Sequence, residues 1–159
     1  MLFIAIILGI VLGDQLIKQY ILNTLEFGES RQFIPAVLQL THTSNAGVAF
    51  GFLQGQPWIP MVLNPIVLIG VVILMVRGII ADRWQRWAMT AVVAGGAGNL
   101  IDRFVHGFVV DMFEFSFVRF AIFNLADVFI TLGVIAFGFA LVFEELRRRR
   151  AQGSEPSHE

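Results

Sequence analysis

The chain has 159 residues, of which 57% are hydrophobic and only 14% are charged, whereas a soluble domain carries about 25% charged residues. This composition excludes an ordinary water-soluble surface, so we expect a single domain embedded in a membrane. The net charge of −1 provides no basic face for nucleic acid. The lack of cysteine excludes disulfides, thiolate catalysis and cysteine-based metal sites.

Four apolar segments approach the length of about 20 residues that a membrane helix needs. They cover residues 1–22, 58–77, 87–105 and 121–144. The first has no Lys or Arg before it and no small-residue cleavage site after it, so we interpret it as a retained helix rather than a secretory signal peptide. The third is the least apolar, but it is rich in Ala and Gly, which predicts close helix packing inside the bundle.

Basic residues predict the orientation of these segments. Three arginines lie between the second and third segments, and four more follow the last segment as Arg147–Arg150. Both positions are cytoplasmic under the positive-inside rule. The two chain ends are then cytoplasmic, and residues 23–57 and 106–120 lie on the outer, periplasmic side. We expect residues 1–146 to form one domain and residues 147–159 to form a basic, then polar, disordered cytoplasmic tail.

The two outer segments differ in character. Residues Val37 to Thr43 have partial strand character, while residues 106–120 are crowded with phenylalanine, which predicts a segment at the membrane surface. The predicted fold class is therefore an all-α membrane protein. It has four transmembrane helices, a small β-containing region on the outer side and a Phe-rich interfacial segment.

Charged residues inside or beside the apolar segments indicate where a site lies, because a charge at the centre of a membrane helix costs about 2.5–3.5 kcal/mol. These residues are Asp14, Lys18, Asp102, Arg103, Asp111 and Asp127. The predicted topology places all of them toward the outer ends of their segments. A single outer-side site explains this clustering better than six unrelated anchors do.

Asp127 and Asp111 have contrasting surroundings. Asp127 lies where the fourth helix begins. There it completes a capping box with Asn124 as N-cap, or it faces a cavity while the helix dipole favours its ionised form. The two interpretations are compatible. Asp111 lies among apolar neighbours, where burial would raise its pKa, although an exposed loop acid is the alternative. Two carboxylates of unequal proton affinity form the kind of pair that aspartic peptidases use.

The remaining charges leave alternatives open. Asp102 does not suit the C-terminal end of a helix, so it needs a partner, and Lys18 and Arg103 are the candidates. Asp14 and Lys18 form an i,i+4 pair in the favourable order. This pair either neutralises charge locally or takes part in the site.

Together these motifs resemble the lipoprotein signal peptidase (signal peptidase II) family. The resemblance spans roughly residues 10–130, with the motifs in order. The matching stretches are Asp14-Gln15 with Lys18, Asn45 to Gly51, Gly95 to Arg103 with Gly107 to Asp111, and Phe123 to Asp127.

The resemblance implies an aspartyl endopeptidase of the bacterial inner membrane. Its substrate would be a prolipoprotein that carries diacylglyceryl on a cysteine, and cleavage would fall just before that cysteine. By motif, Asp111 and Asp127 match the catalytic pair. The matching substrate-binding positions are Asn45, Gly47, Asn99, Arg103 and Asn124, and the supporting positions are Asp14, Lys18, Asp102 and Ala126. We expect no metal and no cofactor, a monomer surrounded by membrane lipids, and inhibition by a peptide antibiotic of the globomycin type.

Two other classes of protein compete with a peptidase. A proton- or ion-coupled transporter also uses intramembrane carboxylates, and Asn64 with Pro65 in the second segment is a hint of one. No internal repeat accompanies that hint. A small assembly subunit would use the charges as helix contacts. That class does not explain why two of the acids lie in or beside an outer loop.

Overall fold

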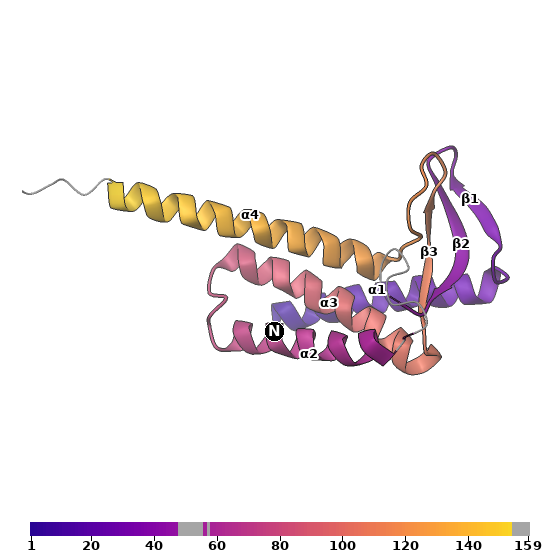
Figure 1. The fold of residues 1–159 in the computed structure, drawn as a ribbon, viewed down its shortest axis with the longest axis horizontal. Coiled ribbons are helices and arrows are strands. Elements are labelled where there is room, and N and C mark those ends of the chain that lie inside the picture. Colours follow the sequence, from indigo (N-terminus) through magenta and orange to yellow (C-terminus); the bar gives the residue numbers. More distant parts are fainter. Residues whose placement is uncertain (48–55, 57, 154–159) are drawn as a thin grey trace, which may run out of the picture.

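The computed structural model describes residues 1–47, 56 and 58–153. Its elements follow in the order α1 (Leu2–Thr24), β1 (Ser30–Ile34), β2 (Leu38–Asn45), α2 (Trp58–Val76), α3 (Arg83–His106), β3 (Val109–Phe115) and α4 (Leu125–Gly153). The helices run alongside one another and the strands stand together at one end of the bundle, as Figure 1 shows. The N-terminus and the far end of α4 lie away from that sheet.

Three of the described helices, α1, α2 and α4, are long and apolar enough to cross a membrane. Helix α1 illustrates the apolar surface that such a helix presents to lipid. Its Leu8, Leu12 and Leu16 recur every four residues and are each about 60% exposed, which forms an apolar stripe on one face. Such a surface is stable in lipid, and the chain is therefore a membrane protein. Helix α3 is absent from this group because polar and charged residues occupy both of its ends.

Helix α3 lies at the centre of the bundle and packs against each of the other three helices. Gly95 leaves no room for a side chain against the α4 backbone. Gly96 packs in the same way against Leu68 of α2, and Gly98 packs against Asp14 of α1. The predicted close packing of this small-residue run is confirmed, and it explains how a less apolar helix occupies the interior.

The strands form one antiparallel sheet in the order β1–β2–β3. The expected strand near residues 37–43 is confirmed as β2. Its partners β1 and β3 were not predicted, because β3 begins with apolar residues on both faces instead of alternating. One face of β3 packs through Val110 and Met112 against Ile21 and Leu25, at the end of α1. This contact fixes the sheet on the helical bundle.

The fourth apolar segment, predicted as residues 121–144, differs from α4 at both ends, although α4 does begin directly after its predicted N-cap Asn124. Residues 121–124 are not helical, because Phe123 pairs with Phe113 as a short continuation of the sheet. At the other end, α4 continues to Gly153, so residues 147–153 are helical where disorder was expected. The i,i+4 ion pairs Glu144–Arg148 and Glu145–Arg149 stabilise this extension. The rest of the expected tail, residues 154–159, lies outside the described residues.

Candidate functional site

Asp111 and Asp127 line a single cavity of about 1440 Å³ between the sheet and the helices α2, α3 and α4. Asp111 extends from β3, and Asp127 lies in the first turn of α4. The predicted residues Asn45, Asn99 and Arg103 line the same cavity. Polar residues from four elements, which are far apart in the sequence, therefore meet at one end of an otherwise apolar cavity.

Asn124 joins the two carboxylates. Its side-chain Nδ2 donates to Asp111 Oδ1 at 2.6 Å, and its backbone N–H donates to Asp127 Oδ2 at 3.2 Å. In return, its Oδ1 accepts the backbone N–H of Asp127 at 2.9 Å. The predicted capping box is confirmed, and the residue that caps α4 also holds Asp111 beside Asp127.

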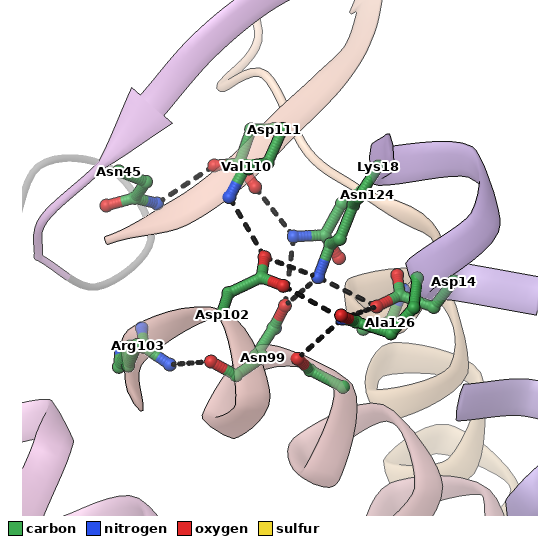
Figure 2. Close-up of polar contacts among 12 residues, drawn as sticks. Asp14, Lys18, Asn45, Asn99, Asp102, Arg103, Val110, Asp111, Asn124 and Ala126 are labelled. Carbon is green, nitrogen blue, oxygen red and sulfur yellow. Dashed lines mark hydrogen bonds and ion pairs between the residues drawn. The ribbon is translucent and has the colours of Figure 1, made fainter. Parts of the chain in front are cut away.

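Two further asparagines complete the hydrogen bonding of the carboxylates. Asn99 donates through Nδ2 to Asp127 Oδ1 at 2.7 Å, and Asn45 donates through Nδ2 to Asp111 Oδ2 at 3.1 Å. Figure 2 shows Asn45 and Asn124 on either side of Asp111. Each of the four carboxylate oxygens thus accepts a hydrogen bond, so both groups are held in fixed orientations.

Asp111 is almost completely buried, with 2% of its surface exposed. Burial raises the pKa of this carboxyl to about 7, and the charge of Asp127 adds to the effect. The bonds from Asn45 and Asn124 and the charge of Lys18 lower the pKa and only partly offset the increase. The alternative interpretation of Asp111 as an exposed loop acid is therefore wrong.

Arg103 connects α3 to the end of β2. Its Nη2 donates to the carbonyl oxygen of Gly47 at 3.1 Å, and its Nη1 lies 3.4 Å from the carbonyl oxygen of Asn99. The backbone N–H of Gly47 in turn donates to Asn45 Oδ1 at 3.0 Å. The predicted residue Gly47 therefore acts through its backbone, because it orients Asn45 toward Asp111.

A buried ionic cluster lies beside these residues. Lys18 Nζ is 2.8 Å from Asp14 Oδ2 and 2.9 Å from Asp102 Oδ2. Of the two candidate partners of Asp102, the structure selects Lys18. Sequence reasoning missed Gln15 as a member of the cluster, although its Nε2 donates to Asp102 Oδ1 at 2.8 Å. Its polarity within an apolar helix was the available indication.

The fold and this polar cavity define the class of the protein as a small helical membrane enzyme. Two solved bacterial membrane enzymes share the fold. One, determined by the in meso method at 2.3 Å, aligns with a TM-score of 0.83 at 31% identity and covers 99% of this chain and 93% of its own. The other, at 1.9 Å, aligns with a TM-score of 0.79 at 34% identity and covers 87% and 91%.

The chain belongs to the signal peptidase II family. The family model described as "Signal peptidase (SPase) II" matches residues 6–143. The lipoprotein signal peptidase of Streptococcus pneumoniae is 41% identical over 144 residues, covering 90% of this chain and 94% of that protein. The lipoprotein signal peptidase of Lactococcus lactis is 37% identical over 142 residues, covering 89% and 93%. The resemblance found in the sequence is confirmed, and the family is one of peptidases that remove signal peptides from prolipoproteins.

Proposed function

We propose that the protein is an aspartyl endopeptidase that cleaves diacylglyceryl-modified prolipoproteins just before the lipidated cysteine. Asp111 and Asp127 are the catalytic pair. The observation that carries this proposal is the convergence of both carboxylates on Asn124 at the wall of one cavity. Two neighbouring carboxylates are the groups with which aspartic peptidases activate water without a metal.

The surroundings of the two acids support different roles in the reaction. Asp127 lies in the first turn of α4, where the helix dipole favours a negative charge, which suits an ionised base that takes a proton from water. Asp111, with its pKa near 7, suits an acid that gives a proton to the leaving amide nitrogen. Water adds to the carbonyl carbon, the C–N bond then breaks, and the two products leave with one water consumed. The titration belongs to the pair as a unit.

The neighbouring side chains divide into two groups in this proposal. Three asparagines donate hydrogen bonds to the carboxylates through their side-chain amides, so they shape the site and contact the substrate only at its edge. These residues are Asn45, Asn99 and Asn124. Arg103 lines the cavity and has five guanidinium N–H donors, of which the bonds to Asn99 and Gly47 use two, which suits a role in binding a substrate carbonyl.

The cavity combines one polar end with apolar walls, which matches a lipidated peptide. Ile59, Leu63 and Val67 of α2 line one side, and Val128 and Leu132 of α4 line the other. A substrate that stays anchored in the membrane presents its scissile bond at the interface.

A cyclic peptide antibiotic of the globomycin type would compete with the substrate for this cavity. The enzyme would act as a monomer among membrane lipids.

The proposed setting is the bacterial inner membrane, with all four helices crossing it. Helix α3 crosses as the polar-ended centre of the bundle, shielded from lipid by its three neighbours. The arginines near the end of α4, at the start of α3 and directly after α2 lie at the cytoplasmic side with both chain ends. The sheet and the carboxylates then face the periplasm.

The experiment that tests this function compares two matched substrates with the purified protein in lipid. One prolipoprotein carries diacylglyceryl on its cysteine, and the other has serine at that position and cannot be lipidated. We expect cleavage of the lipidated form alone, with mass spectrometry placing the new N-terminus at the modified cysteine. Equal cleavage of both substrates, or cleavage at another bond, would contradict the proposal.

A further inference from the structure

The Asp14–Lys18–Asp102 cluster lies behind the cavity rather than in its wall. Its side chains are 1%, 2% and 1% exposed, respectively, and the described residues that line the cavity do not include them. A substrate in the cavity would therefore not touch them. Ionic groups buried this deeply are expensive to desolvate, and apolar residues of similar size often stabilise a fold equally well. Stability alone is thus a weak explanation for the cluster.

The two acids of the cluster bind backbone groups next to the proposed catalytic pair. Asp14 Oδ1 accepts the N–H of Ala126 at 2.9 Å, and Asp102 Oδ2 accepts the N–H of Val110 at 3.0 Å. Ala126 immediately precedes Asp127, and Val110 immediately precedes Asp111. Figure 2 shows both backbone contacts within one group of residues. One cluster therefore holds the peptide group before each of the two carboxylates.

Lys18 connects these two attachments and adds a third. Besides its two carboxylate partners, its Nζ donates to Asn99 Oδ1 at 3.0 Å. An ammonium group only donates hydrogen bonds, so the amide of Asn99 must turn its oxygen toward Lys18. Its NH₂ group then faces Asp127 Oδ1. Asn124 Nδ2 donates to the same oxygen of Asn99 at 3.0 Å, so Lys18 and Asn124 together ensure that Asp127 receives a donor.

We propose that the Asp14–Lys18–Asp102 cluster is a positioning unit that sets both the relative placement and the hydrogen bonding of Asp111 and Asp127. This inference rests on the proposed function. Asp14 fixes the start of α4, Asp102 fixes β3, and Lys18 ties the two together and orients Asn99. Gln15 belongs to the same unit, because its bond to Asp102 Oδ1 leaves Oδ2 of that carboxylate to Lys18 and Val110.

The test measures the kinetics of Lys18→Met and Asp102→Asn on the lipidated substrate. We expect kcat to fall about 100-fold in each, as for a misplacement of reacting groups by about 1 Å, while KM changes by less than about threefold. In Lys18→Met, Asn99 Oδ1 keeps only the bond from Asn124 Nδ2, so the amide that donates to Asp127 is held less firmly. Lys18→Met also removes a charge that lowers the pKa of Asp111, so the basic limb of the pH–rate profile, which the proton on Asp111 sets, should move to higher pH.

A matched control separates positioning from general stability. Gln85 is buried in α3 and donates to Glu144 at 2.6 Å at the end of the bundle away from the sheet. Gln85→Leu removes a comparable buried contact there. It should lower the unfolding temperature and leave the pH–rate profile unchanged.

Gln15→Leu keeps the test decisive if a charge variant does not fold. It leaves all three charges of the cluster intact and removes the amide that donates to Asp102 Oδ1, to the carbonyl oxygen of Gly98 and, at 3.4 Å, to Asp14 Oδ2. We expect kcat to fall about tenfold, the effect of about 1.4 kcal/mol of lost hydrogen bonding. The proposal is overturned if folded Asp102→Asn and Gln15→Leu keep the wild-type kcat and pH profile. If Asp102→Asn and Gln15→Leu behave like wild type while Asp111→Asn and Asp127→Asn are inactive, only the positioning role fails. Turnover by Asp111→Asn and Asp127→Asn would instead overturn the proposed function.

Discussion

At the residue scale, the two central acids could be recognised from the sequence, but their connections could not. Asp111 and Asp127 were conspicuous because charges are rare in or beside apolar segments of this kind. The partner of Asp102 stayed open between Lys18 and Arg103, since the choice depends on how α1 and α3 are rotated against each other. Gln15 was missed for the same reason. Local sequence gives the residues of the network, and helix packing decides which of them bond.

The raised pKa of Asp111 makes a prediction about stability. Its pKa lies near 7 in the folded protein, above the value of 3.8 for an ordinary aspartate. The folded state therefore binds more protons than the unfolded state between about pH 4 and pH 7, and its stability falls as the pH rises through that window. Asp111→Asn does not titrate, so it should unfold at a higher temperature than wild type at about pH 8.

Thermal unfolding in detergent at several pH values checks this prediction. The advantage of Asp111→Asn should shrink as the pH falls through this window and vanish below the ordinary value of 3.8, where the wild-type carboxyl is protonated in both states. A difference between the two proteins that stays constant across this range would show that Asp111 is not held with a raised pKa.

At the scale of the elements, the apolar helices were predictable and the sheet was not. Lipid requires long apolar segments, so residues 58–77 closely anticipated α2. Residues 121–123 are also apolar, so hydropathy alone gave no reason to begin the fourth segment after them, although Asn124 marked the start of the helix as its N-cap. Their pairing with β3 depends on a partner ten residues away in the chain. Strand pairing is a tertiary contact, which a local pattern does not contain.

The glycines of α3 provide a graded test of how closely the helices pack. In Gly95→Ala the new methyl group would meet the backbone carbonyl of Ala126, which cannot move independently of α4. In Gly96→Ala it would meet the side chain of Leu68, which can change rotamer. We expect a loss of stability of about 1–3 kcal/mol from overpacking in Gly95→Ala and a smaller loss in Gly96→Ala.

Gly70→Ala is the matched control, because a Cβ at that position of α2 meets nothing within 4 Å. It should be neutral or slightly stabilising, as alanine is the better helix former. Denaturation in mixed micelles would rank the three variants. Equal stability of Gly95→Ala and Gly70→Ala would contradict the close approach of α3 and α4.

At the scale of the whole molecule, the polar features divide between two ends. The sheet and the two carboxylates gather at one end, and the arginine-rich end of α4 lies away from it (Figure 1). The sequence predicted this separation from the positions of the basic residues alone. What the sequence could not give was the closeness of the two acids, because 16 positions of chain separate them and their approach depends on β3 docking beside α4.

The natural absence of cysteine allows a direct test of the orientation. We expect Gln32→Cys in β1, which is exposed in the sheet, to react with a membrane-impermeant maleimide added to spheroplasts. Ala81→Cys, exposed between α2 and α3, should react only after the membrane is permeabilised. Labelling in the reverse order would show that the carboxylates face the cytoplasm.

The most direct test of the account is the cleavage of a diacylated prolipoprotein by Asp111→Asn and Asp127→Asn, each purified in folded form. Glu114→Gln is the control, since Glu114 is a carboxylate of the same strand that bonds to Gln39 and Thr41 instead of the two asparagines that hold Asp111. We predict that each aspartate variant loses roughly 10²–10⁴-fold in rate, as expected for removal of an acid or base, while Glu114→Gln stays within about threefold of wild type. Wild-type turnover in either folded aspartate variant would contradict the assignment of the catalytic pair.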